Sequence, residues 1–248
     1  MNAYITVRKG SQRIPNKNLR PFVDTNLLQN KISTLKECKR VDDILVTSNC
    51  EESLSIAEKN GCLLDVRPEK YCSSETQPKD LYKYMAQVLS EKFPDDRYFL
   101  SASVCYPLIS PNSFDSMIKL FLDNYNPDLE GYSSLNWITS LSSCHSVKEN
   151  LWERSREIIY LDRDGPLYSP SYEALNYTPG EQPASQDLPD IVSVAFGSII
   201  TSIRTLEEGD LVGEFPELYD LPKYESVDID EEEDFVVAEA LYKHFKNK

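Results

Sequence analysis

Residues 3–20 read AYITVRKGSQRIPNKNLR, a short apolar run that passes directly into a loop rich in positive charge. The run 3–7 is typical of a buried strand, and residues 8–20 contain five cations, one Gly, one Ser and two Asn. In a chain with a formal net charge of -15, this concentration of cations favours a polyanion as ligand. Backbone N–H groups near Gly10 and Ser11 can face phosphate oxygens while Arg and Lys side chains neutralise them. A solvated basic loop is the alternative interpretation.

Outward from this stretch, apolar runs alternate with helical patterns through the first half of the chain. The periodicity predicts strands at 43–47, 62–66 and 98–100, and helices at 27–35, 51–60 (stopped by Gly61), 79–89 and 112–125 (capped by Asn112 or Ser113). This β-α-β-α order indicates an α/β fold with a mostly parallel sheet, whose ligands bind beyond the carboxyl ends of the strands. The basic loop, the segment 47–49 and the loop after Ser101 should therefore face one crevice.

The segment 138–189 has a weaker pattern, with scattered prolines and many aromatic residues. We predict an α/β domain formed by residues 1–137 plus 190–248, with 138–189 as an inserted arm. Aromatic side chains favour protein interfaces, so we expect a hairpin that docks onto a second subunit. A long lid folded over its own domain is the alternative. The aromatic residues concerned are Trp152, Tyr160, Tyr168, Tyr172 and Tyr177.

The composition excludes several classes of protein. An acidic balance of 41 Asp and Glu against 26 Lys and Arg argues against a nucleic-acid binder. The presence of only two histidines argues against a His-built zinc site, and the six cysteines lack metal-ligand spacing. The apolar stretch 191–203 is too short to span a membrane. With no signal peptide apparent, we expect reduced thiols and a cytoplasmic protein.

A second informative segment, Asp228-Ile229-Asp230, places two carboxylates at positions i and i+2. In an extended backbone the two point to the same side, and two hard oxygen ligands suit Mg²⁺. The same residues precede a predicted C-terminal helix. Acidic residues also favour helix N-termini, so capping by Asp230 or by residues 231–234 is the alternative.

Taken in order, these motifs resemble those of the sialic-acid and related sugar-acid cytidylyltransferases. The resemblance begins with the strand and basic loop at 3–20 and closes with Asp228-Ile229-Asp230 and Glu233-Asp234-Phe235. Between them lie weaker matches at 44–48, Arg67-Pro68, Tyr106-Pro107-Leu108 and Gln186-Asp187-Leu188-Pro189.

The resemblance implies a Rossmann-like three-layer α/β/α nucleotidyltransferase fold with an inserted dimerisation arm, and hence a homodimer. It implies transfer of CMP from CTP to the anomeric hydroxyl of a sugar acid, with release of pyrophosphate and with Mg²⁺ as cofactor. No nucleic acid or membrane partner is expected. The implied nucleotide contacts are Arg8, Gly10, Ser11, Lys17, Asn18 and Arg67; the metal ligands are Asp228 and Asp230; the acceptor contacts are Ser103, Tyr106 and Gln186; and the catalytic set is Arg8, Lys17, Asp228 and Asp230. Arg8 and Lys17 are expected to line an open loop.

The chain departs from the family pattern on the acceptor side. The family's usual Gln and Arg around P-T-S-P-L-R are Ser103 and Ile109 here, and its N-G-A triplet is Ala195-Phe196-Gly197. We therefore expect an intact nucleotide half and an altered acceptor half. A sugar nucleotidyltransferase that uses another nucleotide is one alternative, disfavoured because Gly10 is the single glycine of the first loop. A non-catalytic nucleotide-binding relative is the other.

Overall fold

The computed structural model describes residues 1–124, 140–161 and 165–246, and between 154 and 172 it describes the backbone alone. The chain divides into two compact units, which are described separately: Met1–His145 with Val194–Lys248, and Ser146–Ser193. Within the described ranges, no helix combines the length and the apolar character needed to cross a bilayer.

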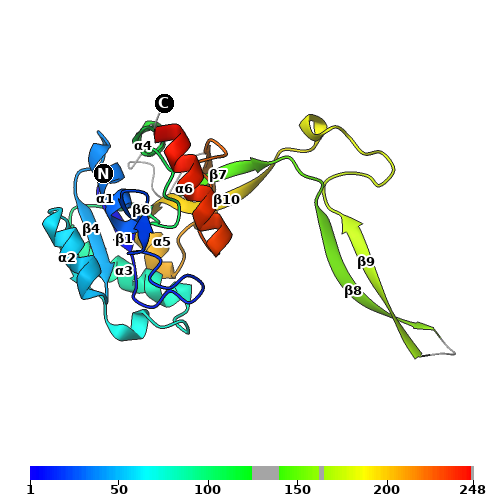
Figure 1. Cartoon of the computed structure of the whole chain (residues 1–248), viewed down its shortest axis with the longest axis horizontal. Helices are drawn as coiled ribbons and strands as arrows, with labels where there is room; N and C mark the ends of the chain where they lie inside the picture. Colours follow the sequence, from blue (N-terminus) through cyan, green and yellow to red (C-terminus); the bar gives the residue numbers. More distant parts are fainter. Residues whose placement is uncertain (125–139, 162–164, 247–248) are drawn as a thin grey trace, which may run out of the picture. The chain divides into compact units, whose positions relative to one another are not determined.

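A seven-stranded sheet forms the centre of the first unit, in the order β11-β7-β10-β6-β1-β4-β5 (Figure 1). The pairs β1–β4, β1–β6, β4–β5 and β7–β11 are parallel, whereas β10 runs antiparallel to β6. The strands are β1 (Ala3–Thr6), β4 (Ile44–Ser48), β5 (Leu63–Val66), β6 (Tyr98–Ala102), β7 (Ser140–Val147), β10 (Ile191–Ser202) and β11 (Pro216–Asp220). A separate two-stranded ribbon pairs β2 (Pro21–Phe22) with β3 (Thr25–Asn26).

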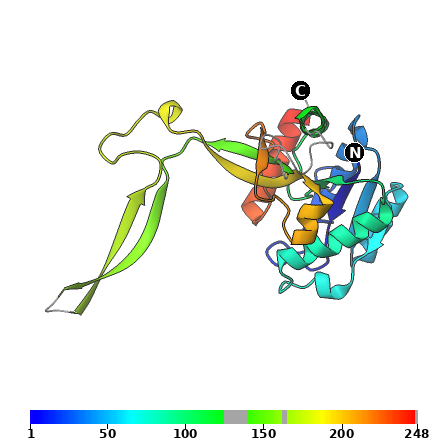
Figure 2. The ribbon, with the colours of Figure 1, turned by 180° about the vertical axis from the view of Figure 1, so that it is seen from behind.

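Helices cover both faces of this sheet, as the opposite views of Figures 1 and 2 show. Successive residues of β1 point to opposite faces: Ala3 and Ile5 join a core with α1, α2, α4 and α6, and Tyr4 joins a second core with α3 and α5. The protein is thus a three-layer α/β/α fold with a mostly parallel sheet, as predicted. The helices are α1 (Leu27–Glu37), α2 (Glu51–Lys59), α3 (Pro78–Lys92), α4 (Pro111–Asn124), α5 (Ile203–Glu208) and α6 (Glu232–Lys246), with a short 3₁₀ turn η1 (Glu69–Tyr71).

Local predictions agree with the structure at most of these elements. The helix predicted at 51–60 is α2, and Gly61 follows it with φ +69°, the left-handed conformation that ends many helices. The predicted cap of α4 is wrong, because the helix begins at Pro111. The Ser110 hydroxyl accepts a hydrogen bond from the Ser113 backbone N–H at 3.2 Å, so Ser110 is the capping residue.

The second unit contains an antiparallel hairpin of β8 (Trp152–Leu161) and β9 (Gly165–Ala174), together with a short 3₁₀ turn η3 (Ser185–Asp187). The predicted hairpin is therefore present. The rings of Trp152 and Tyr177 meet edge to face at 5.8 Å, and 46% of Trp152 is exposed. The structure does not describe the side chains of Tyr160, Tyr168 and Tyr172. Docking of this hairpin onto a second subunit stays a prediction.

Candidate active site

The carboxyl ends of three neighbouring parallel strands meet at one edge of the sheet. After β1, the Val7 N–H donates to the Thr47 carbonyl at 3.1 Å, and the Lys9 N–H donates to Asn49 Oδ1 at 2.9 Å. Beyond β6, the Cys105 carbonyl accepts from the Ile229 N–H at 2.9 Å. The loops predicted to face one crevice, and the acidic segment 228–230, are therefore close together.

The basic loop, residues 8–20, is held by its own backbone and by α1. Asn18 is a bridge: its side-chain amide donates to the Arg8 carbonyl at 3.2 Å, and its carbonyl accepts from the Leu28 N–H at 3.1 Å. Gly10 has φ +84° with no heavy atom within 4 Å of where a Cβ would stand, so its peptide is open to a ligand. Ser11 follows, partly exposed.

The far end of the basic loop reaches the acidic segment. Arg13 pairs with Asp230 at 2.7 Å, and Lys17 donates to the Ile229 carbonyl at 2.7 Å while its Nζ lies 3.8 Å from Asp230. Arg20 makes a two-point contact with Glu232 at 2.6 Å and 2.6 Å. The expectation that Lys17 lines an open loop is wrong, because only 13% of its side chain is exposed.

The contacts around Asp228 and Asp230 distinguish between the two interpretations of this acid pair, metal binding and helix capping. Ile229 is fully buried while Asp228 and Asp230 on either side are partly exposed, the alternation expected of an extended segment. The cap of α6 is made by Asp234, whose Oδ2 accepts from the N–H groups of Asp230 at 3.0 Å and Glu231 at 2.8 Å. These backbone bonds lower the pKa of Asp234. The carboxylates of Asp228 and Asp230 are thus not needed for capping.

The charge distribution around Asp228 suits a hard divalent cation. Burial first, and then the charge of Asp230, raise the pKa of Asp228, while the charge of Lys17 lowers it. Arg13 and Lys17 therefore balance part of the negative charge of the pair. Among the described residues, no three or more His, Cys, Asp and Glu side chains gather into a metal cluster. In proteins, Mg²⁺ is usually bound by one or two carboxylates, and water and substrate phosphates supply the remaining ligands. The carboxylates of Asp228 and Asp230 fit this arrangement.

Arg67 occupies a different position from the one expected of a nucleotide contact. Its side chain is only 4% exposed, and its guanidinium donates to the Val7 carbonyl beneath the start of the basic loop. Arg8 is partly exposed and donates to the Cys72 carbonyl at 2.8 Å. Arg67 therefore supports the end of β1, while Arg8 lies nearer the surface where a phosphate can reach it.

The expected acceptor residues fall in different places. Ser103 is partly exposed, with its hydroxyl accepting from the Cys105 N–H at 3.2 Å. Tyr106 is 7% exposed; burial first, and then the charge of nearby Asp228, raise the pKa of Tyr106. Gln186 is exposed in η3 of the second unit. The structure therefore places Ser103 and Tyr106 just beyond the carboxyl end of β6.

Two cations that sequence reasoning missed also contribute to this edge of the sheet. Arg13 was one of several loop cations, and only its contact with Asp230 distinguishes it. Lys31 is completely buried in α1, where its Nζ donates to the Tyr106 carbonyl at 2.8 Å. Burial lowers its pKa to about 7, with Cys38, Glu225 and Cys105 acting in the opposite direction. A lysine within a helical pattern reads as a surface residue, so no sequence signal marked it.

The buried Lys31 predicts a pH-dependent stability. The pKa of Lys31 is about 7 in the folded chain and 10.5 ordinarily. Between these values the folded chain binds fewer protons than the unfolded one, so the free energy of unfolding decreases as the pH falls from about 10.5 through about 7. The stability of the wild type relative to Lys31→Met should therefore rise from pH 6 to pH 9, by about 2–3 kcal/mol. Urea unfolding at both pH values measures it. Lys36→Met, on an exposed residue of the same helix, is the control and should show no such rise.

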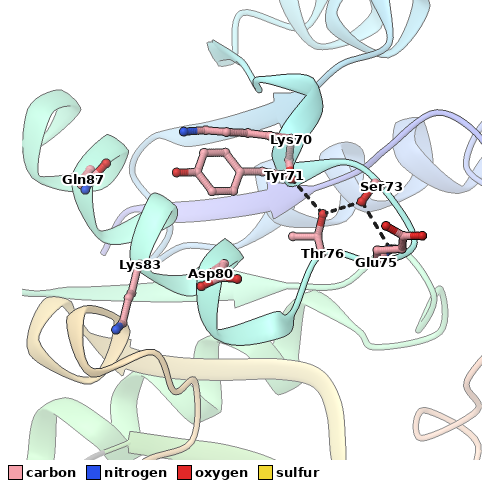
Figure 3. Close-up of a pocket in the computed structure, with 8 residues that line it drawn as sticks. All are labelled: Lys70, Tyr71, Ser73, Glu75, Thr76, Asp80, Lys83 and Gln87. Atoms are coloured by element: carbon pink, nitrogen blue, oxygen red, sulfur yellow. Dashed lines mark hydrogen bonds between the residues drawn. The ribbon is translucent and has the colours of Figure 1, made fainter.

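A cavity of about 530 Å³ lies between η1 and α3 (Figure 3). Cationic and acidic side chains both line it, and Tyr71 in its wall stacks on Tyr84 at 4.5 Å. None of the expected site residues lines it. Its lining residues are Lys70, Tyr71, Ser73, Glu75, Thr76, Asp80, Lys83 and Gln87.

A parallel α/β/α sheet whose first loop is basic and faces an acid pair places the chain in the nucleotidyltransferase-like fold class. Within that class the assignment is specific. A family model described as cytidylyltransferase matches residues 3–167, and the chain belongs to this family. The match takes in the basic loop and the strands β1, β4, β5 and β6. A search of curated proteins finds no significant match.

Solved structures share the fold at low sequence identity. The CMP:2-keto-3-deoxy-manno-octonic acid synthetase complexed with CTP superposes with a TM-score of 0.62 at 13% identity, covering 98% of this chain and 99% of the other. The 4-diphosphocytidyl-2C-methyl-D-erythritol synthase from Anaerococcus prevotii gives 0.55 at 12%, covering 98% and 95%. A cytidylyltransferase from Leptospira borgpetersenii gives 0.54 at 18%, covering 99% and 95%.

Proposed function

We propose that this chain transfers CMP from CTP to the anomeric hydroxyl of a sugar acid and releases pyrophosphate. The observation that carries the proposal is the contact between the basic loop and the acid pair. Lys17 and Arg13 reach the Ile229–Asp230 segment from more than 200 residues away. Cations for phosphates and carboxylates for a metal thus meet at the carboxyl edge of the sheet, where such folds bind nucleotides.

In the proposed reaction, the acceptor hydroxyl oxygen forms a bond to the α-phosphorus as the bond to the β-phosphate oxygen breaks. The hydroxyl proton passes to solvent. Arg8 and Lys17, with the N–H groups near Gly10 and Ser11 and the amide of Asn18, hold the phosphates in line. Such transfer depends on positioning and charge neutralisation rather than on a covalent nucleophile.

Asp228 and Asp230 would hold Mg²⁺, which when bound neutralises charge on the phosphates. In the resting arrangement the Asp230 carboxylate is neutralised by Arg13 and approached by Lys17. Both cations are therefore already near the place where phosphate charge must be balanced.

The acceptor class rests on the sequence resemblance and is supported by one structural neighbour, whose name is that of a synthetase for a CMP-linked 2-keto-3-deoxy sugar acid. Ser103 and Ile109 replace the polar and basic residues usual in the resembling family. We therefore expect an acceptor whose carboxylate is recognised elsewhere. The arm carries three arginines that could supply this cation to the acceptor pocket of a neighbouring subunit: Arg154, Arg156 and Arg163. Arg163, and the side chains of the other two, lie outside the part of the chain that the structure describes.

A pyrophosphate-release assay tests the proposal. CTP, UTP, ATP and GTP are each combined with Mg²⁺ and a panel of eight- and nine-carbon 2-keto-3-deoxy sugar acids; a polyol phosphate serves as the comparison acceptor. We expect pyrophosphate release with CTP and at least one of the sugar acids, and with no other combination of nucleotide and acceptor. A sugar phosphate is included as a further acceptor, and its use with UTP or GTP would favour a sugar nucleotidyltransferase that uses another nucleotide. No release with any pair would leave a non-catalytic nucleotide-binding protein.

We also predict a homodimer with the hairpin β8–β9 at its interface. The exposed Trp152, packed edge to face against Tyr177, supports an interface at the base of the hairpin, since aromatic residues commonly anchor such contacts. Sedimentation at micromolar concentration should show a single dimeric species. Replacing 153–173 by a short Gly-Ser linker should yield monomers, and a monomeric wild type or a dimeric deletion variant would contradict the prediction.

A further inference from the structure

A buried lysine contacts the loop that follows β6. Lys31 of α1 is completely buried, and its Nζ donates to the Tyr106 carbonyl at 2.8 Å. The ring of Phe114 has its centroid 4.9 Å from the same Nζ. An apolar side chain could fill this volume without the cost of burying an ammonium group. The hydrogen bond to the loop is therefore what distinguishes lysine at this position.

The preceding residue of the helix makes the next contact along the same loop. The Asn30 amide, which is also buried, donates to the Pro107 carbonyl at 3.0 Å. Neither carbonyl belongs to a strand or a helix, so neither has a partner in regular secondary structure. Two successive side chains of α1 thus satisfy two successive carbonyls of the loop, and α1 fixes where its backbone lies.

The segment that precedes α6 fixes the same loop at two further points. The Ser110 N–H donates to Glu225 Oε2 at 3.2 Å, and Glu225 is 1% exposed. The Ile229 N–H donates to the Cys105 carbonyl at 2.9 Å. A buried carboxylate therefore holds one end of the loop while the buried lysine holds the middle, and their opposite charges favour each other.

The Tyr106 ring itself packs against β10. A Cβ at Gly197 would stand 2.5 Å from Tyr106 Cγ and 2.8 Å from Ile109 Cδ1, closer than real Cβ atoms come. The Ser103 N–H also donates to the Gly197 carbonyl, at 3.0 Å. The loop 103–110 is therefore fixed through a ring as well as along its backbone.

The same helix supports the basic loop, through other residues. The Leu28 N–H donates to the Asn18 carbonyl at 3.1 Å, and the Asn18 amide donates to the Arg8 carbonyl at 3.2 Å. Helix α1 thus supports both loops, but each by its own contacts. A change at Lys31 can therefore loosen the loop after β6 and spare the basic loop.

We propose that Lys31 is a positioning residue for the acceptor: its side chain, through the Tyr106 carbonyl, holds the loop 103–110 in place beside the acceptor. The expected acceptor contacts Ser103 and Tyr106 both lie on this loop. The inference rests on the proposed function, because it takes this loop as the acceptor side of the site. Lys31 is too deeply buried to touch a substrate, so its effect passes through the loop.

Three variants test the inference. Lys31→Met removes the donor to the Tyr106 carbonyl, and Asn30→Leu removes the donor to the Pro107 carbonyl. Ile32→Val is the matched control, because Ile32 is completely buried in the same helix and belongs to the apolar core.

Two kinds of measurement are made on the full chain. Amide hydrogen exchange without ligands, followed by mass spectrometry, compares peptides that cover 103–110 with peptides that cover 8–20. In parallel, the dissociation constant of CTP with Mg²⁺ is measured, together with kcat and the KM for the sugar acid that supports pyrophosphate release in the wild type.

Lys31→Met should speed amide exchange in 103–110 by roughly 10-fold and leave 8–20 unchanged, because it removes a hydrogen bond to one loop only. The KM for the sugar acid should rise by roughly 10-fold, while kcat and the CTP dissociation constant stay within about twofold of the wild type. Asn30→Leu should act in the same direction but less strongly, because its neutral amide is a weaker donor than an ammonium group. Ile32→Val should lower stability but leave this KM within about twofold of the wild type.

Several results would overturn the inference. Unchanged exchange in 103–110 of Lys31→Met would do so, and so would equal acceleration in 103–110 and 8–20, which would indicate a general loss of stability. Faster exchange in 103–110 with an unchanged KM for the sugar acid would show that the loop does not position the acceptor. If Lys31→Met does not fold, the same measurements on Asn30→Leu decide the question.

Failure of the proposed function has a different signature. A wild type that turns over no nucleotide with any acceptor would end that proposal. Faster exchange confined to 103–110 in Lys31→Met would then still support the hold of Lys31 on the loop, and unchanged exchange would overturn both.

Discussion

Asp228→Asn and Asp230→Asn should each lower the turnover of CTP by at least ~10²-fold, because each removes one of two carboxylates proposed to hold the catalytic cation. Neither side chain caps α6, since Asp234 performs that function. Folding should therefore stay cooperative in both variants. Pyrophosphate release under saturating CTP measures the first effect, and urea unfolding measures the second.

Glu233→Gln is the control for this pair. It removes one negative charge from the same segment, at an exposed residue in the first turn of α6. We expect its turnover to stay within about twofold of the wild type, because an exposed charge acts only weakly through solvent. Full activity in both Asp variants, or an equal loss in Glu233→Gln, would contradict a metal role for the pair.

Lys17→Met should cause the second large effect, a combined loss of turnover and stability. Its Nζ donates to the Ile229 carbonyl at 2.7 Å and lies 3.8 Å from Asp230, with the side chain largely enclosed. Losing this charged hydrogen bond should lower the free energy of unfolding by about 1.5–3 kcal/mol. Because the same cation is proposed to bind phosphate, turnover should fall by at least ~10²-fold.

Lys9→Met is the matched control on the same loop. Lys9 is exposed, and its contact with Asn49 is made by the backbone N–H rather than by the ammonium group. Its replacement should change neither unfolding nor turnover by much. Similar losses in the two variants would show that the total charge of the loop matters, and not the position of Lys17.

The order of the main elements could be predicted from the sequence because their local signals are strong. The run 44–48, buried at every position, is typical of a strand covered on both faces, and Gly61 after α2 marks a helix end. Once parallel strands are assumed, their carboxyl ends must lie at one edge of the sheet. The convergence of the basic loop with the segment 47–49 follows from that rule alone.

The sequence did not predict two features correctly: strand β7, where the local signal was weak, and the cap of α4, where several neighbouring residues carried the same signal. Strand β7 was not predicted, because Ser140, Ser142 and Ser143 read as polar although all three are completely buried. The Ser143 hydroxyl shows how such a residue is accommodated: it donates to the Ala195 carbonyl at 2.6 Å and accepts from the Ser198 N–H at 3.2 Å. At α4, several residues could serve as caps, and the choice of Ser110 depends on where the helix begins.

The sequence by itself determined the α/β alternation, the basic loop after the first strand and the spacing of the two acids before the last helix. These are properties of neighbouring residues, and periodicity and charge express them directly. Only the tertiary structure decided that Lys17 supports the Asp228–Asp230 segment, that Lys31 is buried beneath the Tyr106 carbonyl and that the Tyr106 ring fits against Gly197. Each of these depends on groups 75 or more residues apart, whose distance is set by how the layers pack and not by any local pattern.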